Sequence, residues 1–513
     1  LYGLITWGSL FNDRQIVAMQ TFIECFHEII EEMRKEINDP EYLKAIAVYL
    51  GIWIDRISVR MSNVGRWNLS RETLEGPFDK QGIPMKWDYP EVNPFNQVTG
   101  GAKRQLDWIL RFINKEGANR KISNIILGDG IYIPLDDNSI DYTITDPPYF
   151  DAISYSDLAD FFYIWLKRGL KKIFPDVFLT PLSPKSEEAT ALNHRHDGDS
   201  TKADQHFVLK MSSIFNKMNE LTKKGGIITV MFAHQSTKAW TALINALFKA
   251  GLTINATWPI ETERKNRSVA LESSALTSSI TVACRERVVG SAVAFNDVKK
   301  EIIEVVSDSV RRFWAYGFRG ADLIVSCYGP AVGVFGKYER VEKADGTPVE
   351  IPELLKLAQE IARDEIAGEF RGDNLSTLYY VWANLYGATE QDWDDARLVV
   401  QIGGDAENAM DIAKRHGIFV VEGSKCRLAL ISDREDTKNL GMESDPTRID
   451  ALHRTMILWK EEYRKELMNY LLERNLLEDD SLWKLAQSLF EVLPRNIEDW
   501  KYIHALLGER HTL

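Results

Sequence analysis

Apolar residues near the amino terminus recur every three to four positions, which is the spacing of an amphipathic helix. The first such segment covers residues 13–37, where Asn12 or Asp13 is a suitable N-cap. A second helix is expected over residues 40–61 and a third over residues 102–120, after an ordered loop rich in proline, glycine and aromatic residues. This part of the chain is therefore predicted to be a helical segment.

The middle of the chain alternates short apolar runs with amphipathic helical segments. Short runs of β-branched residues are typical of buried strands in a parallel sheet. The alternation predicts an α/β fold with a mostly parallel sheet. Strands are expected at residues 125–127, 140–144, 227–232, 252–258 and 278–284, and helices at residues 155–170, 207–221 and 240–250.

From about residue 290 the apolar spacing becomes helical again, without an internal repeat of fixed period. Helices are expected at residues 298–316, 351–366, 376–385, 405–416, 450–477 and 481–492. We therefore predict three regions: a helical segment with its loop (1–120), an α/β core (121–290) and a mainly helical accessory region (291–513).

The composition is that of a soluble globular protein. Hydrophobic residues make up 45% and charged residues 27% of the 513 residues, a length that accommodates two or three domains. No apolar run approaches the length of a membrane-spanning helix, and no signal-peptide pattern follows Leu1. We expect a cytoplasmic protein with no membrane partner and, because the chain does not begin with methionine, a lost upstream segment.

Cysteine usage and charge narrow the chemistry further. The four cysteines are scattered and form no CxxC pair, which argues against a zinc ribbon, and we expect no metal site. The net charge of −13 disfavours nucleic acid as a partner, but an enzyme that grips DNA in one cleft can still be acidic overall. Basic clusters such as Lys167, Arg168, Lys171 and Lys172 fit either a solvated surface or phosphate contacts.

The most specific chemical signal is the tetrapeptide Asp146-Pro147-Pro148-Tyr149, which follows the expected strand at residues 140–144. The exocyclic amine of a nucleobase is a weak nucleophile because its lone pair is delocalised into the ring. The Asp146 carboxylate and the Pro147 carbonyl could accept both amine hydrogens, which favours the geometry in which that lone pair attacks. Two prolines stiffen the turn that aims these acceptors. An amine activated in this way needs a methyl donor as the second substrate.

Two further features surround this motif. Tyr149, and also Phe150, could stack on a base extruded from a duplex. Asp129 follows the preceding apolar run, and ligands of open α/β sheets bind at the carboxyl ends of the strands. The alternative is that Asp-Pro-Pro-Tyr is only a turn that ends a strand.

With these residues identified, the chain resembles a family of large bacterial and archaeal adenine-specific DNA methylases. These begin with a conserved domain of unknown function, and some occur in anti-phage gene clusters. The resemblance covers nearly the whole chain. It includes residues 81–95 (QGIPMKWDYPEVNPF), 128–168 (beginning GDGIYIPLDDNSIDYTITDPPYF), 225–234 (GGIITVMFAH), 258–264 (WPIETER), 274–287 (SALTSSITVACRER) and 320–335 (GADLIVSCYGPAVGVF).

The resemblance implies a Rossmann-like S-adenosylmethionine-dependent methyltransferase sheet, of which this chain holds the later strands. It implies methyl transfer to the exocyclic amine of adenine in DNA, in restriction-modification or anti-phage defence. Residues 146–149 would be the catalytic motif. Gly128, Asp129 and Asp146 would contact the cofactor, with Asp129 against the adenine amine of S-adenosylmethionine.

One departure from the family pattern affects these expectations. Family members carry an upstream Phe-x-Gly-x-Gly loop for the methionine end of the cofactor, and no residue before position 121 supplies it. We expect a separate chain or an upstream segment to provide this loop. The alternatives are a methyltransferase for the cytosine amine, or a catalytically silent DNA- or protein-binding module of a defence complex.

Overall fold

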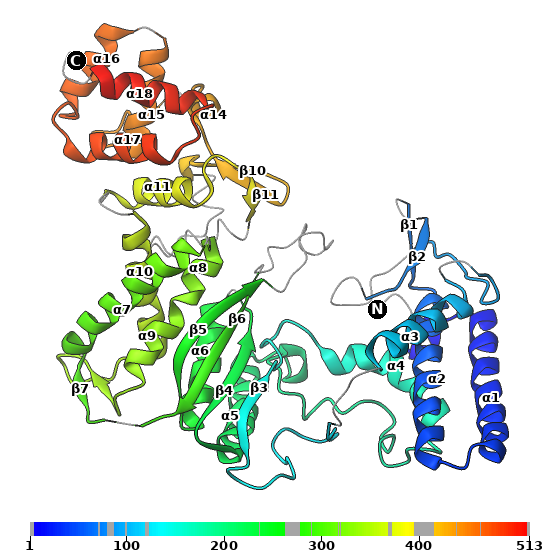
Figure 1. Cartoon of the computed structure of the whole chain (residues 1–513). Coiled ribbons are helices and arrows are strands. Elements are labelled where there is room, and N and C mark those ends of the chain that lie inside the picture. Colours follow the sequence, from blue (N-terminus) through cyan, green and yellow to red (C-terminus); the bar gives the residue numbers. More distant parts are fainter. Residues whose placement is uncertain are drawn as a thin grey trace. The chain divides into compact units, whose positions relative to one another are not determined.

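The computed structural model describes most of the chain (Figure 1). The described residues are 5–69, 72–78, 87–97, 100–117, 123–234, 236–261, 278–288, 290–316, 318, 320–367, 372–393, 415–437, 439–461 and 463–509. They form two compact units, Leu1–Gly128 with Phe150–His206, and Asp129–Tyr149 with Phe207–Leu513. This division differs from the three predicted regions, because residues 150–206 group with the amino-terminal helices and the carboxyl-terminal helices group with the sheet.

The first unit is built on two long helices, α1 (Asp13–Glu36) and α2 (Pro40–Arg60), close to the predicted ranges. The Asn12 side chain accepts a hydrogen bond from the Gln15 backbone, and the Gln15 side chain accepts one from the Asn12 backbone. This capping box fixes the start of α1. The unit also contains α4 (Tyr155–Leu170), η1 (Trp7–Leu10), β1 (Arg66–Asn68), β2 (Thr73–Glu75), α3 (Ala102–Glu116) and η2 (Asn193–Arg195).

The second unit contains a four-stranded mixed sheet. Its strand order is β3 (Ile140–Thr145), β4 (Thr222–Phe232), β6 (Ser278–Glu286) and β5 (Leu252–Glu261). β3 runs parallel to β4, whereas β6 is antiparallel to both of its neighbours. β3, β4 and β5 therefore point in the same direction. The predicted α/β class is confirmed, but the sheet is mixed where a mostly parallel one was predicted, because β6 lies antiparallel between β4 and β5.

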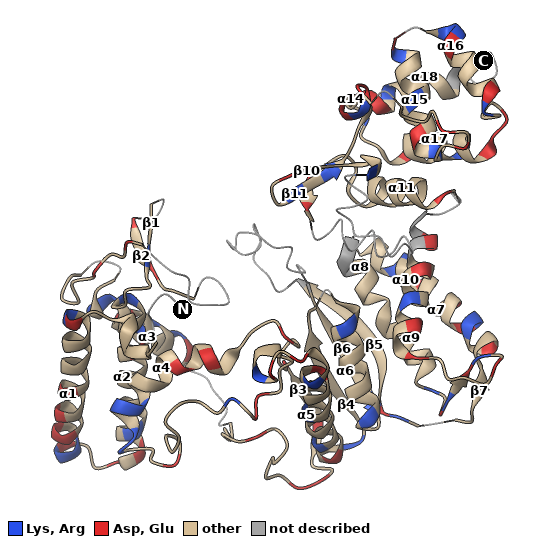
Figure 2. Cartoon of the chain, turned by 180° about the vertical axis from the view of Figure 1, so that it is seen from behind, with Lys and Arg blue, Asp and Glu red and all other residues tan. Residues whose placement is uncertain are grey.

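Helices cover the two faces of this sheet unequally. Helices α5 (Ser200–Leu221) and α6 (Thr237–Lys249) lie on one face (Figures 1 and 2). On this face Trp240 of α6 packs edge-on against Phe232 of β4, with ring centroids 5.1 Å apart. Strand alternation directs Tyr142 and Ile144 of β3 to the opposite face, where they are 71% and 74% exposed.

The outer edge of β5 is covered by helix α9 (Tyr328–Phe335), which packs closely because it carries glycines where it meets the strand. A Cβ at Gly333 would lie 2.7 Å from the carbonyl oxygen of Ile254, and one at Gly329 would lie 2.0 Å from the Thr257 side chain. Larger residues would separate the helix from the strand.

The rest of the second unit is mainly helical. Its further helices are α7 (Phe295–Ala315), α8 (Gly320–Ser326), α10 (Ile351–Ala367), α11 (Asn374–Tyr386), α14 (Ile431–Arg434), α15 (Arg448–Lys460), α16 (Arg464–Glu473), α17 (Asp480–Val492) and α18 (Glu498–Glu509). Its short strands are the parallel pair β7 (Val293–Ala294) and β8 (Val341–Glu342), and the antiparallel set β9 (Gln391–Asp392), β11 (Lys425–Leu428) and β10 (Phe419–Glu422). Among the described helices, none has both the length and the apolar character needed to cross a bilayer.

Two predictions about strands are wrong. Residues 125–127 form no strand, and Ile125 and Leu127 are 93% and 79% exposed. A strand requires a hydrogen-bonded neighbour, and among the described strands β3 pairs with β4 alone. Residues 140–144 do form a strand parallel to β4, but this strand is largely exposed where a buried one was predicted.

Two predicted carboxyl-terminal helices do not match a single described helix. The segment 450–477 is two helices, α15 and α16, where one was expected. The helix predicted at residues 405–416 lies almost wholly outside the described residues.

Candidate functional site

The Asp-Pro-Pro-Tyr motif begins directly after β3, at the carboxyl end of the strand. Because Thr145 pairs with Val230, the motif continues alongside the end of β4 and the residues that follow it. The two parallel strands therefore deliver residues 146–149 and residues 232–234 to the same edge of the sheet.

Asp146 is exposed, and its carboxylate forms no hydrogen bond or ion pair with any residue that the structure describes. Pro147 is buried and Pro148 is half-buried, so the turn that carries the carboxylate is anchored on its proline side. A rigid turn with an unengaged carboxylate suits recognition of an external hydrogen-bond donor.

Tyr149 is the first member of a row of aromatic rings. Its ring lies edge-on to Phe232 at the end of β4, with centroids 5.6 Å apart and planes at 67°. Phe232 packs in turn on Trp240, and Trp240 packs on Tyr328 of α9. Phe232 and Trp240 are fully buried, so the orientation of the half-buried Tyr149 ring is set by a rigid core.

His234 is a candidate site residue that sequence reasoning missed. Its Nδ1 accepts a hydrogen bond from the backbone N–H of Ser236 at 3.0 Å, so the neutral ring carries its proton on Nε2. Its backbone carbonyl accepts a hydrogen bond from the Trp240 indole at 2.8 Å. The available sequence signal was its position two residues after the predicted strand at residues 227–232.

Phe150 differs from Tyr149 in its surroundings. It adopts a left-handed backbone conformation (φ 58°), which is uncommon for a residue with a large side chain. Its carbonyl accepts a hydrogen bond from Ala191 N at 3.0 Å, and it is only 4% exposed. The expected stacking of Phe150 on a base fits this burial poorly, and Tyr149 is the better placed of the two rings.

Gly128 and Asp129 stand at the boundary between the two units. The Asp129 side chain accepts a hydrogen bond from Ile131 N at 2.9 Å and so caps its own turn. A Cβ at Gly128 would meet no atom within 4 Å, so packing does not require glycine there. The structure does not join Asp129 to Asp146 by a hydrogen bond, and the strand that was expected to position Asp129 is absent from the described residues.

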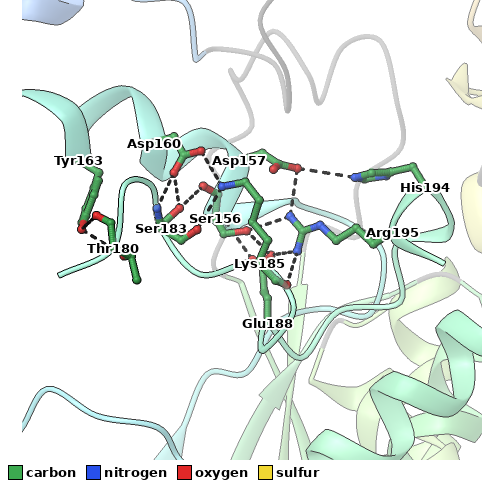
Figure 3. Close-up of polar contacts among 10 residues, drawn as sticks. All are labelled: Ser156, Asp157, Asp160, Tyr163, Thr180, Ser183, Lys185, Glu188, His194 and Arg195. Carbon is green, nitrogen blue, oxygen red and sulfur yellow. Dashed lines mark hydrogen bonds and ion pairs between the residues drawn. The ribbon is translucent and has the colours of Figure 1, made fainter. Parts of the chain in front are cut away.

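A polar cluster holds residues 180–196 against the first turns of α4 (Figure 3). The buried Asp160 carboxylate accepts hydrogen bonds from Ser183 N at 2.8 Å and from Lys185 Nζ at 2.6 Å. Arg195 donates to Asp157 and to Glu188. The Arg195 guanidinium is therefore already neutralised by two carboxylates.

Within the described ranges, no group of three or more His, Cys, Asp or Glu side chains is arranged to hold a metal ion. Comparison of the chain with protein-family models, with curated proteins and with solved structures found no match.

Proposed function

We propose that the chain is the catalytic part of a DNA methyltransferase that transfers a methyl group from S-adenosylmethionine to the exocyclic amine of adenine. The observation that carries this proposal is the unengaged Asp146 carboxylate on a proline-stiffened turn at the carboxyl end of β3. The order β3-β4-β6-β5 is compatible with the later strands of a methyltransferase sheet.

In the proposed reaction, the Asp146 carboxylate accepts one hydrogen of the amine and the Pro147 carbonyl accepts the other. This orientation removes the lone pair from conjugation with the ring and directs it at the donor. Tyr149, held edge-on by Phe232, stacks on the extruded base. S-adenosylmethionine would supply the methyl group: its S–CH3 bond would break as the N–CH3 bond forms, S-adenosylhomocysteine would leave, and one amine proton would pass to the Asp146 carboxylate or to water.

The described residues do not complete a pocket for that donor. Asp129 is engaged in its own turn, and Gly128 faces open space without forming a close cradle. We propose that a partner chain or an upstream segment supplies the glycine-rich cofactor loop. Calorimetry with S-adenosylmethionine tests this directly, because micromolar binding by the chain alone would contradict it.

Two alternatives remain in view. The motif also fits the cytosine amine, since both bases present the same group to Asp146 and Pro147. A catalytically silent DNA- or protein-binding module of a defence complex is favoured by one observation, the incomplete cofactor pocket around Gly128 and Asp129.

Substitution of Asp146 tests the proposed chemistry. Asp146→Ala, in the chain co-produced with the segment that supplies the cofactor loop, is expected to reduce transfer of labelled methyl groups to DNA by at least about a thousandfold. Asp136→Ala is a matched control, because Asp136 is also an exposed aspartate of the second unit but lies outside the motif.

Mass spectrometry of the digested DNA separates N6-methyladenine from N4-methylcytosine. Full activity of the Asp146→Ala protein would overturn the proposal. Inactivity of the wild-type assembly with intact cofactor binding would favour the silent module.

A further inference from the structure

The outer face of α3 carries a stripe of cations with an aromatic ring among them. Arg104, Trp108, Arg111 and Lys115 follow the spacing i, i+4, i+7 and i+11, which places them on one side of a helix. All four are exposed, and Figure 2 shows the charged positions along this helix.

The opposite face of α3 attaches the helix to its unit. Ala102, Gln105 and Ile109 are buried. The Trp53 indole of α2 donates to the Ala102 carbonyl at 2.7 Å, and Arg56 donates to Gln105 at 3.1 Å. These contacts hold the helix without help from the stripe, which is therefore not explained by packing.

Trp108 is 57% exposed, and the Arg111 guanidinium lies over its ring, 5.5 Å from the centroid. Arg104 pairs with Asp107 at 3.5 Å, a surface contact that contributes little to stability. Cations beside an exposed aromatic ring match a polyanion that also offers flat bases.

The sequence interval that contains the motif offers no cation for phosphate. Every charged residue between Lys121 and Lys167 is an aspartate, Asp129 and Asp146 among them. Cations from other segments pair with four of these carboxylates, those of Asp137, Asp141, Asp157 and Asp160. The interval itself supplies no cation for phosphate, and the whole chain has a net charge of −13. A duplex presented to Asp146 must therefore be held by cations outside the interval.

We propose that the Arg104, Trp108, Arg111 and Lys115 face of α3 binds the phosphate backbone of DNA. The proposal rests on the proposed function for its choice of DNA as the polyanion. The other basic cluster of this unit, at the end of α4, is accounted for by its position, because cations stabilise a helix carboxyl terminus. There Lys167 also donates to the Thr180 carbonyl.

Binding of a fluorescein-labelled duplex by the full chain, followed by anisotropy at several salt concentrations, tests the proposal. The variant R104Q/R111Q/K115Q is expected to bind at least about tenfold more weakly and to lower the slope of log K against log salt by about 3. The control R168Q/K171Q/K172Q removes the same charge from the last turn of α4 and the two residues that follow the helix, and it is expected to keep wild-type binding.

Three results would overturn the proposal: equal losses in both variants, no binding of the duplex by the wild type, or binding of anionic phosphatidylserine vesicles in place of DNA. The assay involves no methyl transfer, and Asp146→Ala is expected to leave binding intact. Absence of methylation by the wild-type assembly, with α3-dependent DNA binding retained, would therefore count against the proposed function alone.

Discussion

The two edges of the sheet are finished in different ways. At the β5 edge, α9 lies against the strand so closely that Gly333 leaves no room for a Cβ beside the Ile254 carbonyl. At the β3 edge, no strand among the described residues pairs with the outer side, and Tyr142 and Ile144 are largely exposed. The same sheet therefore has one edge that is packed like a protein interior and one that is not.

This difference places the candidate site on the less protected side. The strand that delivers Asp146 draws its order from β4 on one side, whereas β6 pairs with strands on both sides. Burial on the β5 side stabilises the fold, and exposure on the β3 side leaves apolar surface that contributes nothing until it is covered. The proposed need for a second segment agrees with this asymmetry.

The largest expected effect on stability comes from replacing a buried isoleucine of the sheet with alanine. The same substitution at an exposed isoleucine of β3 provides the comparison. Ile280 of β6 is fully buried and Ile144 of β3 is exposed. Ile280→Ala should lower the free energy of unfolding by about 3 kcal/mol, because it opens a cavity in a packed core. Ile144→Ala should change it by less than about 0.5 kcal/mol. Urea denaturation of both proteins measures the difference, and similar losses would contradict the contrast.

An intermediate effect is expected in the packed carboxyl-terminal helices. The Asp499 carboxylate accepts hydrogen bonds from Ile431 N at 3.3 and 3.2 Å, and burial raises the pKa of Asp499 to about 7. A raised pKa favours the fold at low pH, and this contribution is lost as the pH rises toward 7. Asp499→Asn removes the ionisation. Its stability relative to wild type should therefore increase by about 2 kcal/mol from pH 5 to pH 7.

Denaturation curves at a series of pH values measure this change. Asp436→Asn is a matched control, because Asp436 is exposed in the same region and its replacement alters the net charge equally. If the free energy of unfolding depends on pH in the same way for wild type and Asp499→Asn, the prediction is wrong, and water reaches the Asp499 carboxylate more easily than its burial indicates.

The smallest effect tests the close approach of α9. Gly333→Ala gains helix propensity but forces a Cβ against the Ile254 carbonyl, and the net loss should be about 1 kcal/mol. Gly169→Ala in α4 gains propensity with its nearest contact at 3.6 Å, so it should be neutral or slightly stabilising. Thermal unfolding compares the two variants. Equal melting temperatures would mean that α9 can move away from β5 at little cost in stability.

The spacing of apolar residues along the chain predicted the helices and strands, but not which distant residues each of them contacts. The Asn12 cap and the bounds of α4 followed from spacing and from side-chain chemistry that act over a few residues. Within α4, the Ser156 hydroxyl donates to the carboxylate of Glu188, 32 residues away. Such a partner cannot be identified from spacing alone.

The same limitation explains the errors near the site. The run at residues 125–127 has strand composition, but composition does not reveal whether a pairing strand is present. The burial of Phe150 depends on the chain near Ala191, and the neutralisation of Arg195 depends on Asp157 and Glu188. The motif itself was recognisable because its chemistry is contained in four consecutive residues.

The exposed β3 edge also affects how the protein behaves in solution. An edge strand with exposed apolar side chains is a template for pairing with another polypeptide, including a second copy of itself. At high concentration the chain is expected to self-associate through β3, and a segment that covers this edge would compete with that process. Solubility would then report on docking, because the chain should become more soluble in the presence of a polypeptide that covers β3.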